Sequence, residues 1–276
     1  MIWSFLTVAS YTITAFGDKY IAAKLKCRPA EYILIVSAAT VLWLLFLLPF
    51  TGWKFNICST SLILLSFLII WKLMELFTTS ILLKFMEPYE LKVWLGINII
   101  LSYFYNVYNG KNTLRADMVI LGIFLLSGIY IIVTDTSASK KSILKTIPVC
   151  IFYILSKLMY GIHMREATEH GNSVTILIIV LSVTSIIQLP RLNIKSLISK
   201  KGFLPACATR IPNATGLLTE AFAATANLYF YALIQPLQLL ILFIAGLFKG
   251  TGMSARKKTG SIICIICVCI MTICSA

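Results

Sequence analysis

The sequence carries little charge for its length. Of its 276 residues only 12% are Asp, Glu, Lys or Arg, whereas 59% are hydrophobic. Soluble domains usually contain about 25% charged residues. Mean hydropathy is +0.92, and a lipid bilayer accommodates apolar surface that a water-soluble globule could not bury. The composition therefore excludes soluble enzymes, soluble nucleic-acid binders and secreted disulfide scaffolds, and it predicts an all-α, polytopic membrane protein.

The sequence also lacks the motifs of common membrane enzymes and metal sites. It contains no His-Glu-x-x-His segment, no cluster of acidic metal ligands and no Gly-rich phosphate loop. Cys264 and Cys267 have the spacing of a metal or redox motif, but they lie in an apolar run without a nearby His. We interpret them as small, polarisable packing residues. We therefore expect no enzyme activity, no metal and no cofactor.

Acidic residues are scarcer than basic ones. The chain has 24 Lys and Arg against 10 Asp and Glu, a formal net charge of +14. Most basic residues fall in short gaps between apolar runs, where they orient helices and contact anionic lipid headgroups. We therefore expect membrane lipids and no nucleic acid as partners, and a location in the inner membrane of the cell. The expected oligomeric state is a monomer or a homodimer.

The apolar residues form ten runs, and most of them have about the 20 residues that a membrane-spanning helix needs. The breaks between the runs contain Gly, Pro or charged residues, as at Arg28-Pro29 and Glu87-Pro88. The expected helices cover residues 2–23, 31–50, 61–84, 89–108, 114–134, 143–164, 173–189, 203–226, 228–248 and 260–275. Almost nothing remains for a domain outside the membrane.

Similar residues recur about 140 positions apart along the chain. The pairs are Tyr20 with Tyr160, Leu48-Pro49 with Leu189-Pro190, Gly110 with Gly250, and Glu75-Leu-Phe with Glu220-Ala-Phe. Matches in order and at a nearly constant offset indicate a duplication. We predict two five-helix repeats, residues 1–138 and 139–276. Because five is odd, the second repeat lies inverted relative to the first.

Four short segments carry a resemblance to a known family. They are Phe16-Gly17-Asp18-Lys19-Tyr20, the Asn109-Gly110-Lys111 turn, Gln235-Pro236-Leu237 and the Lys249-Gly250 turn. With its ten runs, the whole chain resembles the drug/metabolite transporter superfamily, and within it the EamA-like transporters. This resemblance implies alternating access around a central cavity lined mainly by the first, third, fourth, sixth, eighth and ninth helices. The chain departs from the family in lacking an acidic residue after Gly110 and Gly250.

The charge pattern and the resemblance lead to opposite orientations. The loops after the odd-numbered runs hold most of the basic residues, so the positive-inside rule places them in the cytoplasm and both termini outside. The resemblance more often implies termini inside. We predict the orientation that the charges favour.

Several ionisable residues fall well inside apolar runs. They are Asp18, Lys19, Lys72, Glu75, Lys157, Arg210 and Glu220. A charge at the centre of a membrane helix costs about 2.5–3.5 kcal/mol on insertion scales. These residues must therefore face the interior, pair with one another or reach the headgroups, and Asp18, Lys19 and Arg210 lie close enough to helix ends for the last option.

Polar and aromatic residues recur at helical spacing on the same six helices that the resemblance implicates. Each such residue could simply join helices, a contact that contributes about 0.6 kcal/mol on average. Their symmetrical placement nevertheless favours a shared, water-accessible cavity. The candidate substrate-binding residues are Tyr11, Asp18, Trp71, Glu75, Asn98, Tyr105, Tyr153, Lys157, Tyr160, Asn213, Glu220, Asn227, Tyr231 and Gln235.

The two candidate carboxylates differ in their local surroundings. Lys72 lies three residues before Glu75 and can neutralise it, whereas no basic residue lies within one helical turn of Glu220. Glu220 is therefore the stronger candidate for exchanging a proton or binding a cation. Lys157 could pair with either carboxylate or bind a substrate carboxylate. Aromatic residues beside them could supply cation–π faces for an amine.

These features predict a secondary active transporter for a small polar organic metabolite, such as an amine or an amino-acid-like compound. The driving force would be proton coupling or exchange. Two alternatives remain open on the sequence. One is a broad-specificity exporter of cationic or aromatic compounds, and the other is a membrane scaffold or accessory subunit that transports nothing.

Overall fold

A computed structural model describes residues 2–110, 113–134, 140–226, 234–248 and 253–275. Within these ranges the chain is helical and forms no β-strand; the β-type pairing found there is one isolated antiparallel bridge between Phe55 and Gly171. Six described helices are long and apolar enough to cross a membrane, which identifies a membrane protein. They cover Pro29–Thr51, Ser59–Phe85, Ala116–Thr134, Thr146–Ala167, Ser173–Arg191 and Ala255–Cys274.

Helix is found in every run in which the sequence predicts it. In the first half the helices are α1 (Ile2–Lys19), continued by the π-helical turn η1 (Tyr20–Lys24), α2 (Pro29–Thr51), α3 (Ser59–Phe85), α4 (Pro88–Tyr108) and α5 (Ala116–Thr134). In the second half they are α6 (Lys140–Ala167), α7 (Ser173–Gln188), the 3-10 turn η2 (Leu189–Arg191), α8 (Ile194–Ile198), α9 (Phe203–Ala208), α10 (Arg210–Ala226), α12 (Ile234–Phe248) and α13 (Ala255–Ser275).

Local chemistry explains where α2 and α4 begin. Pro29 and Pro88 occupy the first helical position, where a missing N–H costs no hydrogen bond. Two residues later in each helix, Glu31 and Glu90 accept hydrogen bonds from the backbone N–H of the preceding cap residue, at 2.8 and 2.9 Å. These carboxylates satisfy amides that have no partner inside the helix.

The expected continuous helix over residues 203–226 is broken. Helix α9 ends at Ala208, Thr209 forms a turn, and α10 begins at Arg210. The break precedes Pro212, whose ring and missing N–H are tolerated in the first turn of a helix but not in its interior. This break lets α10 start within the bundle, where Arg210 is almost fully buried.

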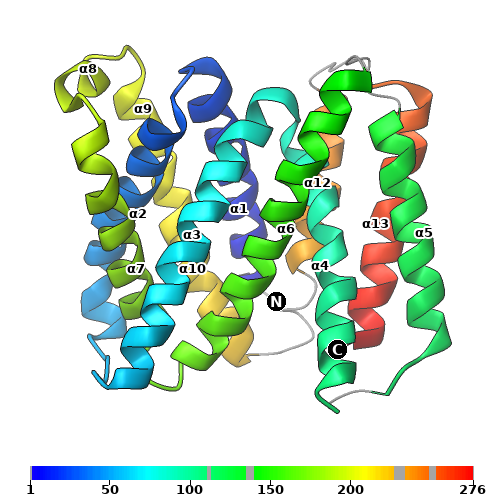
Figure 1. The fold of residues 1–276 in the computed structure, drawn as a ribbon, viewed down its shortest axis with the longest axis horizontal. Helices are drawn as coiled ribbons and strands as arrows, with labels where there is room; N and C mark the ends of the chain where they lie inside the picture. Colours follow the sequence, from blue (N-terminus) through cyan, green and yellow to red (C-terminus); the bar gives the residue numbers. More distant parts are fainter. Residues whose placement is uncertain (1, 111–112, 135–139, 227–233, 249–252, 276) are drawn as a thin grey trace.

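The helices form one bundle in which distant segments pack in pairs. The closest pairs are α1 with α10, α3 with α6, α2 with α7, and α5 with α13. In Figure 1 the α2–α7 pair stands at one end of the bundle and the α5–α13 pair at the other. Between α5 and α13, a Cβ on Gly260 would lie 2.8 Å from the carbonyl oxygen of Gly128. Only glycine permits this approach of the two backbones.

The cysteines of the last helix are packing residues, as the sequence predicts. Cys264 and Cys267 are free and buried, with 0% and 4% of their surface exposed. They belong to a hydrophobic cluster formed mainly by α4, α5, α12 and α13 that includes Leu125 and Met271. No group of three or more His, Cys, Asp or Glu side chains in the described ranges could hold a metal ion.

Candidate functional site

A central cavity of about 740 Å³ lies between the helices. Helices α1, α3, α4, α6, α10 and α12 contribute to its wall, and these are the helices expected to line it. Two further helices, α2 and α7, also reach it through residues such as Tyr32, Thr40 and Leu177. The sequence did not indicate these two helices, because their polar residues are few.

Most of the candidate binding residues lie on the cavity wall. They are Tyr11, Asp18, Glu75, Asn98, Tyr105, Tyr153, Lys157, Tyr160, Asn213, Glu220 and Gln235. Trp71 is not among the lining residues, and its indole nitrogen is buried without a hydrogen-bond partner in the described part of the chain. Asn227 and Tyr231 lie outside the described residues.

Glu75 is the centre of a three-residue ion cluster. One carboxylate oxygen lies 3.0 Å from Nζ of Lys72 on the same helix, and the other lies 2.6 Å from Nζ of Lys157 on α6. The Lys72 ammonium also stands 4.7 Å from the ring centre of Tyr160, a cation–π contact. Of the two partners that the sequence left open for Lys157, the structure shows Glu75. The cluster leaves one excess positive charge in the cavity.

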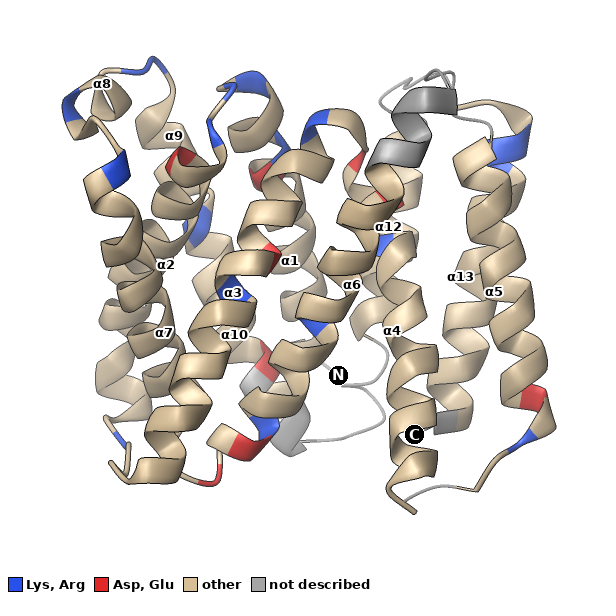
Figure 2. Ribbon diagram, viewed as in Figure 1, with Lys and Arg blue, Asp and Glu red and all other residues tan. Residues whose placement is uncertain are grey.

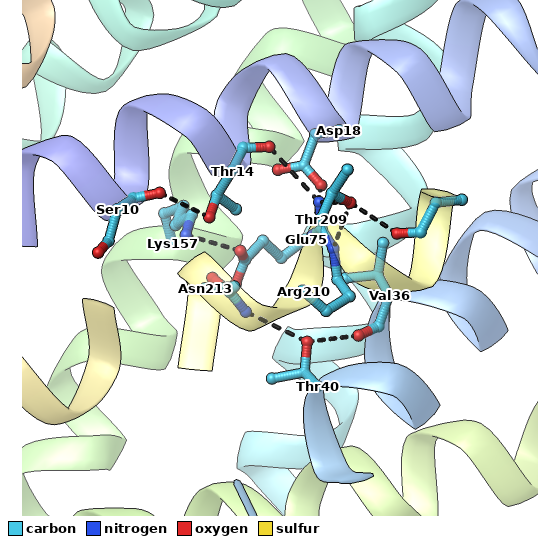
Figure 3. A network of polar contacts seen from close by, with 11 residues as sticks. Ser10, Thr14, Asp18, Val36, Thr40, Glu75, Lys157, Thr209, Arg210 and Asn213 are labelled. Atoms are coloured by element: carbon cyan, nitrogen blue, oxygen red, sulfur yellow. Dashed lines mark hydrogen bonds and ion pairs between the residues drawn. The ribbon is translucent and has the colours of Figure 1, made fainter. Parts of the chain in front are cut away.

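A second ion pair joins the two halves of the chain. Figure 3 shows Asp18 of α1 and Arg210 of α10 pointing toward each other, with 2.7 Å between Oδ1 and Nη1. The guanidinium also donates to the Thr209 hydroxyl at 3.0 Å. Arg210 is 1% exposed, so it points inward and not toward the headgroups. Gly17 allows this arrangement, because a Cβ there would lie 2.5 Å from Cβ of Thr209.

Glu220 lies across from α1 at another level of the cavity. The hydroxyl of Tyr11 donates a hydrogen bond to its carboxylate. On the same helix pair, the hydroxyls of Thr7 and Thr219 are 2.8 Å apart. Polar residues of these helices therefore both face the cavity and join α1 to α10.

Asn213 makes a similar connection between α10 and α2. Its side-chain amide donates to the hydroxyl of Thr40 at 3.2 Å (Figure 3). The Thr40 hydroxyl in turn donates to the backbone carbonyl of Val36 at 2.6 Å. This contact explains how a helix with few polar residues becomes part of the cavity wall.

The cavity is exposed at one end and buried at the other. Tyr105, Arg165 and Glu169, near the C-terminal ends of α4 and α6, line it and are exposed. At the opposite end the lining residues Leu83 and Leu91 are buried. The structure therefore has one open and one closed end.

Further ion pairs lie on the closed side. Lys19 pairs with Glu87 at 3.2 Å, Lys200 with Glu31 at 2.7 Å, and Lys257 with Glu90 at 2.9 Å. Each pair connects segments that are distant in the sequence. In Figure 2, Lys and Arg gather along the upper edge of the bundle, and the two ends of the chain lie away from that edge.

Sequence reasoning missed Lys92. This half-buried residue lines the cavity from the second turn of α4. Helical spacing gave no signal for it, because Lys92 lies six residues before Asn98 and is therefore turned about 120° away from the polar face of α4 that includes Ser102 and Tyr105. Gln238 of α12, three residues after Gln235 on the same helix, is buried and also lines the cavity.

Neither a comparison with protein-family models nor a search of curated proteins finds a match to this chain. The arrangement of the cavity residues therefore carries the functional argument.

Proposed function

We propose that this protein is a secondary active transporter that moves a small polar organic metabolite, an amine or an amino-acid-like compound, across the membrane. The main support is the cavity of about 740 Å³ with charged residues inside an apolar helical bundle. Ionisable groups inside a membrane bundle are costly and usually mark a substrate or ion pathway. The volume suits a small organic molecule. A scaffold has no need of such a space.

Helix packing supports the proposal of ten spans in two inverted repeats. In the proposed duplication, α1 corresponds to α6, α2 to α7, α3 to α10, α4 to α12 and α5 to α13. Exchanging corresponding helices turns the α1–α10 contact into the α6–α3 contact, and the α1–α12 contact into the α6–α4 contact, and all four contacts are present. The contact of α2 with α10 likewise becomes α7–α3, while the α2–α7 and α5–α13 pairs exchange with themselves. Such symmetry is expected of an inverted repeat. It also agrees with the resemblance to EamA-like transporters, which we retain as the proposed family.

The position of the charges supports a mechanism of alternating access. The closed end is held by Lys19–Glu87, Lys200–Glu31 and Lys257–Glu90. These pairs would separate when that end opens, and new contacts would close the other end. The positive-inside rule places the edge of the bundle that is rich in Lys and Arg in the cytoplasm. In this orientation the open end of the cavity faces the outside of the cell, and both termini are outside. Glu220 is the proposed site of proton or cation exchange, because its carboxylate faces the cavity and accepts the Tyr11 hydrogen bond.

Transport by purified protein in liposomes tests this proposal. A panel of amino acids and amines is first screened for thermal stabilisation of the protein, and the compounds that stabilise it are then offered to liposomes as radiolabelled substrates. We expect at least one compound to stabilise the protein and to accumulate in the liposomes, with a rate that depends on an imposed pH gradient or on compound loaded inside. A scaffold or accessory subunit would respond to no compound in either assay.

A further inference from the structure

Among the basic residues of the cavity interior, Lys92 differs from the others. Lys72 and Lys157 share Glu75, and Arg210 pairs with Asp18. Lys92 forms no ion pair within the described part of the chain. Its ammonium therefore offers charge and hydrogen-bond donors to whatever occupies the cavity.

Two amide side chains from α12 lie beside this lysine. Lys92, Gln235 and Gln238 line the main cavity together and also line a smaller space of about 20 Å³ that reaches Val268 of α13. Gln238 is 3% exposed, and a glutamine amide supplies two N–H donors. The wall between α4 and α12 is thus a partly buried site, with Gln238 buried and Gln235 exposed, whose donors include one full positive charge.

The charge balance of the cavity favours an anion at this wall. Away from the open end, the basic lining residues are Lys72, Lys92, Lys157 and Arg210, and the acidic ones are Asp18, Glu75 and Glu220, whereas Arg165, Glu166 and Glu169 line the exposed end. With all of these residues ionised, the interior part of the wall carries one positive charge in excess, although the lining as a whole, with its exposed end, is neutral. A buried charge is costly unless an opposite charge and hydrogen bonds accompany it. A ligand that brings a negative group would satisfy this requirement, whereas a simple cation would add to the repulsion.

We propose that Lys92, with Gln235 and Gln238, binds a carboxylate group of the transported compound. This inference rests on the proposed transport function and narrows its substrate class. The substrate is an amino-acid-like compound that retains its carboxylate, and a simple amine is excluded. Lys92 is then a specificity-determining residue, because it distinguishes an amino acid from the amine left when the carboxylate is removed.

Matched pairs of compounds test the role of the carboxylate. Thermal unfolding of the purified full chain is followed with L-phenylalanine and phenethylamine, L-leucine and isopentylamine, and L-histidine and histamine, each at equal concentration. We expect at least one amino acid to raise the unfolding temperature by about 3 °C when it is near tenfold above its dissociation constant. The corresponding amine should produce less than half of that shift.

Substitutions of Lys92 then test whether this residue is responsible. Lys92→Gln removes the charge and should weaken binding of the stabilising amino acid by about 10- to 100-fold, the value of a hydrogen-bonded ionic contact. Lys92→Arg keeps the charge and should retain a larger share of the affinity. The matched control is Lys84→Gln, because Lys84 is exposed at the end of α3 and does not line the cavity. The Lys84→Gln variant should bind the stabilising amino acid with the affinity of the unmodified protein.

The outcomes separate this inference from the proposed function. If the amines stabilise the protein as well as the amino acids, or if Lys92→Gln leaves the amino-acid affinity unchanged, the carboxylate site is wrong while transport stands. If no compound of the panel has an effect on the unmodified protein, the proposed function itself is contradicted, and the inference fails with it. The acid–amine comparison uses unmodified protein, so it decides the question even if Lys92→Gln does not fold.

Discussion

Replacing Asp18 by asparagine removes one charge from the ion pair between α1 and α10. The pair distance is 2.7 Å, and Arg210 is 1% exposed while Asp18 is 22% exposed. The substitution leaves a buried guanidinium without its counter-charge, and breaking such a pair costs about 3–5 kcal/mol. Because asparagine still accepts a hydrogen bond, we expect the lower end, about 3 kcal/mol. For a chain of this size the unfolding temperature should fall by roughly 6–12 °C.

The chain provides a matched control for this experiment. Arg115 and Asp117 form a pair of 2.5 Å whose side chains are 50% and 47% exposed. An exposed pair contributes at most about 1 kcal/mol, so Asp117→Asn should lower the unfolding temperature by no more than roughly 4 °C. Both variants are measured by the loss of monodisperse protein after heating, in the same detergent and buffer.

A double substitution separates the effect of the unpaired charge from other causes. Changing Arg210 to methionine in the Asp18→Asn background removes the buried cation and keeps much of its volume. Most of the cost of breaking a buried pair comes from the uncompensated charge that is left behind, so removing the guanidinium should recover most of the lost stability. Equal losses in Asp18→Asn and Asp117→Asn, or a double variant less stable than Asp18→Asn alone, would contradict this account of the pair.

The other predictions concern function, packing and orientation. Glu220→Gln keeps the size of the side chain, so the protein should fold while transport or its pH dependence is lost. The control Asp117→Asn, at an exposed position of α5 outside the cavity, should leave both intact. Normal pH-dependent transport in Glu220→Gln would remove the role assigned to Glu220. Gly17→Ala should cost about 1–3 kcal/mol, because its Cβ would lie 2.5 Å from a side-chain atom of the adjacent segment. A Cβ at Gly161 would meet no atom within 4 Å, so Gly161→Ala should be neutral or stabilising by up to about 1 kcal/mol. Unfolding temperatures that shift in the same direction in Gly17→Ala and Gly161→Ala would refute the packing argument. Finally, a cysteine replacing Ala276 should react in intact cells with a maleimide that cannot cross the membrane, and protection there would reverse the proposed orientation.

Much of the helical framework follows from local sequence. The apolar runs, interrupted by proline, glycine or charge, predict where helix forms, and Pro29 and Pro88 fix where α2 and α4 start. The Lys72–Glu75 contact was also predictable, because residues three apart on a helix lie on the same face. These results depend only on the periodicity of a helix and on residues a few positions apart.

Helical periodicity and neighbouring residues do not show which ion-pair partners the charged residues have on other helices. Lys157 had two acidic candidates, and the packing of α6 against α3 selects Glu75. Arg210 lies near the start of its predicted run and was free to extend toward the headgroups. It points inward because the chain turns at Thr209 and meets Asp18, which is 192 residues earlier. Whether two side chains so far apart in the sequence come into contact depends on how all the helices of the bundle pack together.

The sequence by itself indicated the membrane class, the helical segments and several polar residues of the cavity wall, such as Glu75, Asn98 and Asn213, since composition and helical spacing act locally. Only the tertiary structure decided that α2 and α7 reach the cavity, that Trp71 does not line it, and that Lys92 faces it without an ion pair in the described part of the chain. Helical spacing shows which residues share a face. Which helix that face meets, and at what height, is set by how closely the backbones approach, and this depends on small residues such as Gly17 fitting against segments far away in the sequence.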